Sequence, residues 1–301
     1  MAESQAPSQQ VEDPFAGRRR SWRVRSPKTL VATLSILLLF IVLGLFGPHI
    51  APEDPFQLNL VGRLQPPFFE AEGSLDHPLG TDDLGRDTLS RLIYGARISL
   101  LAIVMVIPLA TVIGSILGIL AGWFGGWTSR VIMALVDLQL AMPAILIAVF
   151  LRAIWEPSLS NVVIVLVFAL WATFARLVRG ETLGLKEREF VLAARTIGAN
   201  DLRIMVRHVL PSLVNSIVIL ATLNVATVVI AEAGLSFLGV GIPQDSISWG
   251  IMISQGRGVI VTAWWLVTVP GIAIIVVSLV VNLFGDWLRD FLDPQLRNIQ
   301  R

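Results

Sequence analysis

The sequence predicts an all-α integral membrane protein with six transmembrane helices. Of its 301 residues, 54% are hydrophobic and only 15% are charged, a composition outside the range of soluble globular domains. Its apolar runs are long enough to cross a bilayer as helices, and polar stretches that hold most of the charges separate them. Cysteine is absent from the sequence, which excludes a disulfide framework and thiolate chemistry.

A polar, basic stretch at residues 1–28 comes first, and we expect it to lie at an anionic inner leaflet. The uncharged run that follows would reach about 28 Å as a helix, so we place the first transmembrane helix at residues 29–50. A cleaved signal peptide is the alternative. The run is long for such a peptide, and Pro48 and His49 follow it where a cleavage site of small residues would lie.

Residues 51–97 form a loop with an excess of acidic side chains. Asp82, Asp83 and Asp87 raise the alternative of a cation site, but they lack the spacing of an EF-hand. We expect them instead to cap a helix and to form an Asp–Arg network with Arg86 or Arg91.

The second span is predicted at residues 98–122. It carries small residues at every fourth position, a pattern typical of a helix face that packs closely against a neighbour in lipid: Ala110, Gly114, Gly118 and Gly122. A role in conduction is the sharper alternative, and we favour packing.

The third span is expected at about residues 131–151. Asp137 lies within it and must face protein, water or the inner boundary, because a charge facing lipid at mid-depth costs about 2.5–3.5 kcal/mol. Pro143 is expected to kink this helix. The fourth, fifth and last spans are predicted at residues 158–175, from 212 to beyond 230, and 263–285, with Trp264 and Trp265 at the membrane interface and a tail at 286–301.

Glu232 is a second carboxylate inside the apolar sequence, near the end of the fifth span. It has two readings: it lines a translocation path, or it accepts hydrogen bonds from groups at nearby helix ends. We favour the second, because hydrogen bonding is the commoner reason for a buried carboxylate.

The polar segment between the fourth and fifth spans reads KEREFVLAARTIGANDLRIMVRHVLP. It predicts two short helices, with Gly198 as the stop of the first and Asn200 as the N-cap of the second. Ala193 and Ala194 give the first helix small residues that would let another surface approach its backbone. A solvated connector between two spans is the alternative.

The same segment resembles the EAA loop of ABC-importer permeases, which it reproduces in order and spacing at Glu189, Ala193, Ala194, Gly198, His208 and Pro211. The spelling EFVLAARTIGA followed by RHVLP is similar to the dipeptide/oligopeptide/nickel branch of that family. The likeness extends over residues 30–297 and includes 77–100, 231–250 and 285–297, although 244–247 and Trp287 depart from the usual pattern.

The resemblance implies the fold of a type I ABC permease, with one peripheral helix and a five-helix core at residues 98–285. It implies a coupling loop at 179–211 that docks on a cytoplasmic ATPase, with Asn200 in the docking set. The implied partners are a second permease in a heterodimer, two ATPase subunits, an extracytoplasmic binding protein and membrane lipid. ATP and Mg²⁺ would be bound by the ATPase subunits, and this chain would need no cofactor or metal.

Orientation follows from the basic residues. With six spans, 17 of the 23 Lys and Arg residues fall on the side of the N-terminus, the C-terminus and the 179–211 loop. Basic residues collect in cytoplasmic loops, so we expect both termini and this loop on the cytoplasmic side. The resemblance implies that the membrane is the cytoplasmic membrane of a bacterial cell. The basic residues are dispersed rather than gathered in one patch, which argues against nucleic-acid binding.

The sequence lacks the motifs of an enzyme. Its lysines, Lys28 and Lys186, follow Pro27 and Leu185 and therefore form no P-loop, and no metalloprotease or hydrolase motif is present. We therefore predict a non-enzymatic permease subunit of an ATP-driven importer for di- or oligopeptides. A self-contained ion- or proton-coupled carrier is the competing class, and an intramembrane enzyme is a remote third.

Overall fold

The structure is a computed structural model that describes residues 27–292. Within these residues the regular secondary structure is helical, apart from an isolated β-bridge between Thr81 and Asp87, and loops join the helices. Five helices are long and apolar enough to cross a membrane, and a bent helix pair supplies a sixth candidate. The all-α membrane class predicted from the sequence is confirmed. The basic tail at 1–28 and the end of the tail at 286–301 lie almost wholly outside the described residues.

The first helix, α1 (Pro27–Ile50), leads through a loop and a short 3₁₀ turn, η1 (Leu60–Gly62), into α2 (Thr88–Phe124). The sequence prediction that the loop continues to residue 97 is wrong at its end. Asp87 caps α2 by accepting a 2.7 Å hydrogen bond from the backbone N–H of Ser90. The first turns of α2 carry polar residues because they pack against the loop, and these residues resemble loop sequence.

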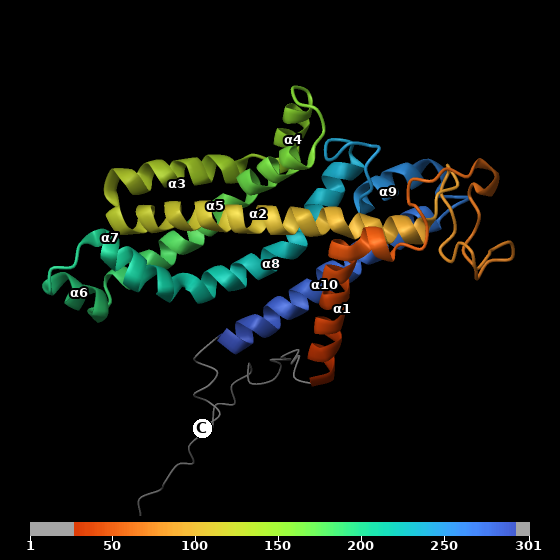
Figure 1. Cartoon of the computed structure of the whole chain (residues 1–301). Coiled ribbons are helices and arrows are strands. Elements are labelled where there is room, and N and C mark those ends of the chain that lie inside the picture. Colours follow the sequence, from red (N-terminus) through yellow and green to blue (C-terminus); the bar gives the residue numbers. More distant parts are fainter. Residues whose placement is uncertain (1–26, 293–301) are drawn as a thin grey trace, which may run out of the picture.

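The small residues of α2 face α5 (Leu159–Lys186), and the two helices run side by side through the centre of the molecule (Figure 1). A Cβ atom added to Gly114 would lie 2.4 Å from the carbonyl oxygen of Trp171, and one added to Gly118 would lie 2.7 Å from that of Ala175. Close packing at this face, as the spacing predicts, is confirmed.

The third span does not form one helix. It consists of two helices, α3 (Gly126–Ala141) and α4 (Ala144–Arg152). The direction of the chain turns by 79° between them, across Met142 and Pro143. The predicted kink is therefore a full break, because proline removes one backbone N–H and clashes with the preceding turn. Asp137 of α3 forms an ion pair with Arg176 of α5, so its charge has a partner within the chain.

Beyond α5 the chain forms α6 (Glu189–Thr196), α7 (Asp201–Ile204) and a π-helical turn, η2 (Met205–Val209), which runs into α8 (Leu210–Phe237). The remaining helices are α9 (Trp249–Gly256), the 3₁₀ turn η3 (Arg257–Val259) and α10 (Trp265–Leu292). The fourth and fifth spans thus extend beyond their predicted limits, since the apolar helices continue into polar sequence at the end that carries α6 and α7.

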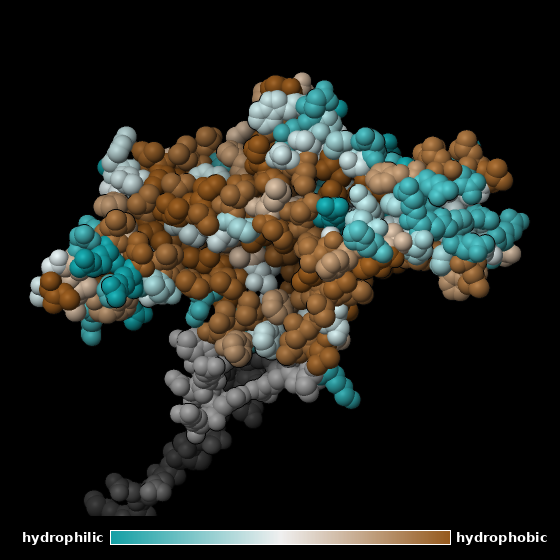
Figure 2. Space-filling model, viewed as in Figure 1, coloured by the Kyte–Doolittle hydropathy of each residue, from teal (hydrophilic) through white to brown (hydrophobic). Residues whose placement is uncertain are grey.

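Polar and apolar surfaces separate along the length of the bundle. Figure 2 shows a broad hydrophobic zone across the middle of the visible face, with hydrophilic residues concentrated at the two ends. One end carries α6 and α7, and the other carries the loop between α1 and α2 (Figure 1). This arrangement fits a bundle whose middle lies in lipid and whose ends lie in water.

Candidate functional site

The segment between α5 and α8, residues 187–209, is the candidate site, and we call it the α6–α7 segment. Its α6 helix ends in a Schellman motif: the N–H of Gly198 donates to the carbonyl of Arg195 and the N–H of Ala199 to that of Ala194, at 3.0 and 3.1 Å. Gly198 has φ +83°, a left-handed conformation that favours glycine. The predicted helix stop is confirmed.

The next helix begins as predicted. The side chain of Asn200 accepts a 2.9 Å hydrogen bond from the N–H of Arg203 and so caps α7. After these four residues the helix passes through a π-helical turn and continues as α8. The α6–α7 segment is therefore a helical hairpin whose second arm is continuous with a transmembrane helix.

One face of the α6–α7 segment packs against the ends of the spans. Its buried residues are Val191, Ala194, Ile204, Met205 and Val209, and they join a cluster with residues of α2, α5 and α8 that includes Ile119, Trp123, Val178 and Leu213. The expectation that Ala194 lies on an outward docking face is wrong, because its exposed fraction is only 6%. The small side chain lets α6 approach its own bundle.

The α6–α7 segment also carries apolar side chains in solvent. Ile197 is 84% exposed and Leu202 is 66% exposed, and Phe190, Leu192 and Val206 of the same segment are exposed as well. Arg188, Arg203 and Arg207 are exposed in the same segment, and a fourth arginine, Arg195, lies with its guanidinium over the ring of Trp123. Exposed apolar residues in such density are typical of a surface that meets another protein or a membrane.

The other residues singled out by the sequence divide between the two arms. Glu189 and Ala193 are exposed on α6. The ring centroid of His208 lies 6.4 Å from that of Phe190, which brings His208 beside α6. Pro211 lies in the first turn of α8, directly after the π-helical turn that joins α7 to α8. Sequence reasoning missed the exposed apolar residues, although Ile197 and Leu202 flank the helix stop and break the polar pattern there.

Glu232 lies outside this site, near the end of α8, and has no exposed surface. Its Oε1 accepts a 2.8 Å hydrogen bond from the hydroxyl of Ser236, one turn further along α8. Its Oε2 accepts a 3.3 Å hydrogen bond from the hydroxyl of Ser99 on α2. The hydrogen-bonded interpretation is confirmed by this geometry, and a role of Glu232 on a translocation path stays a prediction.

Comparison with known proteins gives a family. Residues 114–298 match the family described as binding-protein-dependent transport system inner membrane component. The chain belongs to this family. It is 40% identical to the dipeptide transport system permease protein DppC of Escherichia coli, over 90% of this chain and 90% of that protein. It is 39% identical to the di/tripeptide transport system permease protein DppC of Pseudomonas aeruginosa, over 90% of this chain and 89% of that one.

A solved structure supports the fold of this permease. A chain of the inward-facing MetNI methionine ABC transporter aligns with a TM-score of 0.55 and 20% sequence identity, covering 67% of the permease and 96% of that chain. The type I importer fold implied by the EAA-like loop is thereby confirmed, and the secondary-carrier alternative is not favoured.

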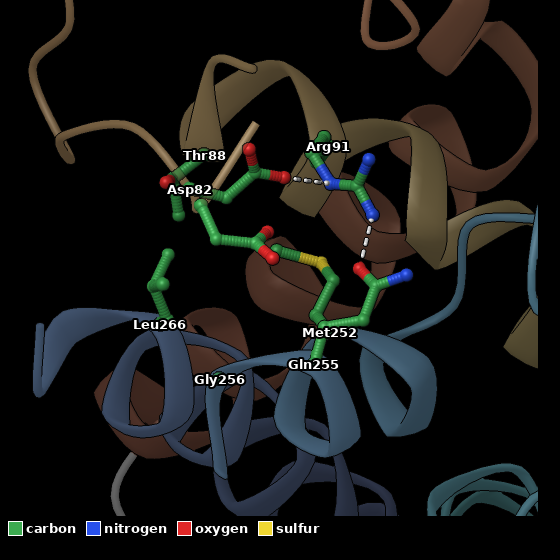
Figure 3. A pocket seen from close by; sticks show the side chains of 8 residues that line it. Asp82, Thr88, Arg91, Met252, Gln255, Gly256 and Leu266 are labelled. Carbon is green, nitrogen blue, oxygen red and sulfur yellow. Dashed lines mark hydrogen bonds and ion pairs between the residues drawn. The ribbon is translucent and has the colours of Figure 1, made fainter. Parts of the chain in front are cut away.

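At the other end of the permease, charged groups help to fix the loop between α1 and α2. The carboxylate Oδ2 of Asp82 lies 2.7 Å from Nε of Arg86 and 3.5 Å from Nε of Arg91. Nη2 of Arg91 also donates a 2.8 Å hydrogen bond to the side-chain oxygen of Gln255 on α9. Figure 3 shows Arg91 between Asp82 and Gln255. The predicted Asp–Arg network is confirmed and ties the loop to α2 and α9.

A hollow of about 510 Å³ in the permease lies between α2, α3 and α5. Its lining is aliphatic and aromatic except for Gln139, whose amide nitrogen donates to the carbonyl of Ala169 at 3.3 Å. A peptide bond moved from water into such a lining would lose its hydrogen bonds, at a cost of about 1–3 kcal/mol per group. This hollow is therefore poorly suited to hold a peptide.

Proposed function

We propose that this permease is one of two membrane subunits of an ATP-driven importer for di- and oligopeptides. The α6–α7 segment is the observation that carries the proposal: it presents an apolar, arginine-rich surface to solvent at one end of a membrane bundle. A membrane subunit that lacks a P-loop needs such a surface to receive work from a separate ATPase. The names of the relatives support peptide as the substrate class.

In this proposal the α6–α7 segment docks on one of two cytoplasmic ATPase subunits, which bind ATP and Mg²⁺. The docking residues are Glu189, Ala193, Gly198, Asn200 and His208, together with the exposed apolar residues between them. Ala194 acts indirectly, by holding α6 against the bundle, and the exposed Pro211 in the first turn of α8 belongs to the proposed docking set. The basic residues on this side support a cytoplasmic placement of the segment and of both termini.

The opposite end faces the extracytoplasmic binding protein, in keeping with the family description. Its loop would occupy residues 51–87, and the five-helix core would begin at α2. Movement of the ATPases would displace the α6–α7 segment as a rigid body, and the continuity of η2 with α8 supports transfer of that movement into the spans. Alternating exposure of a path between two permease subunits would follow.

Reconstitution tests the proposal. The permease, its partner permease and the ATPases are placed in liposomes with ATP inside and the binding protein with a labelled dipeptide outside. We expect ATP-dependent uptake that requires the binding protein. Uptake driven by an ion gradient without ATP would instead identify a secondary carrier, and uptake of a nickel chelate but no peptide would correct the substrate class.

A further inference from the structure

The α6 helix is bracketed by two cationic side chains that contact the same residue of α2. Lys186, the last residue of α5, donates a 2.7 Å hydrogen bond from Nζ to the backbone carbonyl of Trp123. Arg195, in the last turn of α6, lies with its guanidinium carbon 4.8 Å from the centroid of the Trp123 ring. Trp123 thus receives one cation through its backbone and one through its side chain.

The position of Trp123 explains why it attracts cations. It lies in the last turn of α2, which ends at Phe124, so its carbonyl has no partner within the helix. The C-terminal end of a helix carries a partial negative charge that favours Lys and Arg, and an indole ring attracts a cation to its face. Trp123 is only 2% exposed, so its ring is held by the surrounding cluster and presents a fixed surface.

The helix that holds this residue spans the molecule. α2 has 37 residues, which corresponds to a rod of about 55 Å. Its far end is fixed to the Asp82 network through Arg91. A displacement of α6 that is passed to Trp123 would therefore reach the opposite surface through one continuous helix, in addition to the route through α8.

We propose that Trp123 and Arg195 are positioning residues that join the α6 helix to α2, so that α6 and α2 move together when the ATPases close. This inference rests on the proposed function of the α6–α7 segment and names the contact through which that function reaches a second span. Lys186 supports the same junction from the other end of α6.

The chain supplies a matched control at the same end of the bundle. The guanidinium carbon of Arg130 lies 5.6 Å from the ring centroid of Trp127, so this pair has the same chemistry. Trp127 is 73% exposed and both residues belong to α3, outside the α6–α7 segment and its cluster. Loss of this pair removes a cation–π contact without touching the junction.

The experiment compares Arg195→Gln and Trp123→Leu with Arg130→Gln and Trp127→Leu in the full reconstituted complex. The measurements are the amount of ATPase that co-purifies and the ratio of labelled dipeptide transported to ATP hydrolysed. A merely structural defect lowers the yield of the complex and both rates together, but it leaves that ratio unchanged. Arg195→Gln changes an exposed side chain, so it tests the inference even where Trp123→Leu fails to fold.

We expect Arg195→Gln to retain the ATPases and to lower the transport ratio about two- to five-fold, the range of one cation–π contact, while Arg195→Lys recovers most of it. The α3 variants should match the unaltered protein. A normal ratio in Arg195→Gln, or an equal loss in Arg130→Gln, overturns the inference. Loss of the ATPases in Arg195→Gln would also overturn it, because Arg195 would then bind the ATPase directly.

Failure of the inference and failure of the proposed function are distinguishable through Ile197. If only the inference fails, Ile197→Asp on the exposed face still releases the ATPases while Arg195→Gln transports normally. If the proposed function fails, both variants retain every activity of the unaltered complex.

Discussion

Glu232 of α8 and Ser99 of α2 are joined by a 3.3 Å hydrogen bond in the interior of the bundle. Because Ser236 satisfies the other carboxylate oxygen, the group holds two helices together without exposed surface. Two charged residues in the predicted spans therefore receive partners from neighbouring elements: Glu232 from hydroxyls, and Asp137 from Arg176.

The first prediction concerns this contact. Glu232→Gln should assemble and transport nearly normally, because the amide oxygen accepts one hydroxyl and the amide N–H donates to the other. Glu232→Leu should lower stability by about 1–3 kcal/mol, since both serine hydroxyls lose a buried partner. Thermal unfolding of the purified complex, followed beside transport, measures both. A large loss of transport in Glu232→Gln with normal assembly would place Glu232 on the path instead.

The second prediction concerns helix packing. Gly114→Ala should reduce the yield of folded protein, because the new Cβ would lie 2.4 Å from the carbonyl of Trp171. Gly180→Ala on α5 is the matched control: a Cβ there meets nothing within 4 Å, and alanine in an open helical position stabilises by up to about 1 kcal/mol. Equal yields of the two variants in a detergent-solubility assay would contradict the packing role.

The sequence predicted the helical class, the packing face of α2 and the stop at Gly198, because each depends on local spacing. It missed features that depend on tertiary partners. The polar start of α2 was predicted as loop, since the residues that bury Arg91 come from distant segments. Ala194 was placed on the outer face of α6, because helical periodicity shows which residues share a face but cannot show which face meets the bundle.

The third prediction concerns orientation. The sequence contains no cysteine, so single cysteines can be read directly. Gln244→Cys should react with a membrane-impermeant thiol reagent in intact cells, whereas Ile197→Cys should react only after the membrane is opened. Both positions are exposed in the chain, so accessibility within the fold does not confuse the result. Reaction of Ile197→Cys alone in intact cells would reverse the proposed topology.

The fourth prediction separates the two faces of α6. Ala194→Trp should destabilise the α6–α7 segment, because Ala194 is only 6% exposed and a ring would force α6 away from Val178 and Leu213. Gly198→Val should add about 1–2 kcal/mol of backbone strain at φ +83°. Faster limited proteolysis within residues 187–209 measures both effects, with Gly184→Ala as the control. Unchanged proteolysis of Ala194→Trp would contradict the packing seen here.

The last prediction concerns the outer face, where Ile197 is 84% exposed and Leu202 is 66% exposed. Aspartate at either position should weaken ATPase docking about ten-fold or more, since a charge in the apolar centre of an interface lacks a partner and apolar anchors at such centres are typically worth over 1 kcal/mol. The stability of the permease should not change, because both side chains lie in water.

Val261→Asp is the matched control: this valine is 93% exposed beyond the other end of the bundle, just before α10, where no ATPase is expected. Co-purification of the ATPases with each variant, at equal permease yield, is the measurement. Because the substitution, exposure and added charge are alike at the two ends, a loss confined to Ile197→Asp and Leu202→Asp identifies this face as the docking surface, whereas full retention of the ATPases would leave the α6–α7 segment as a connector between two spans.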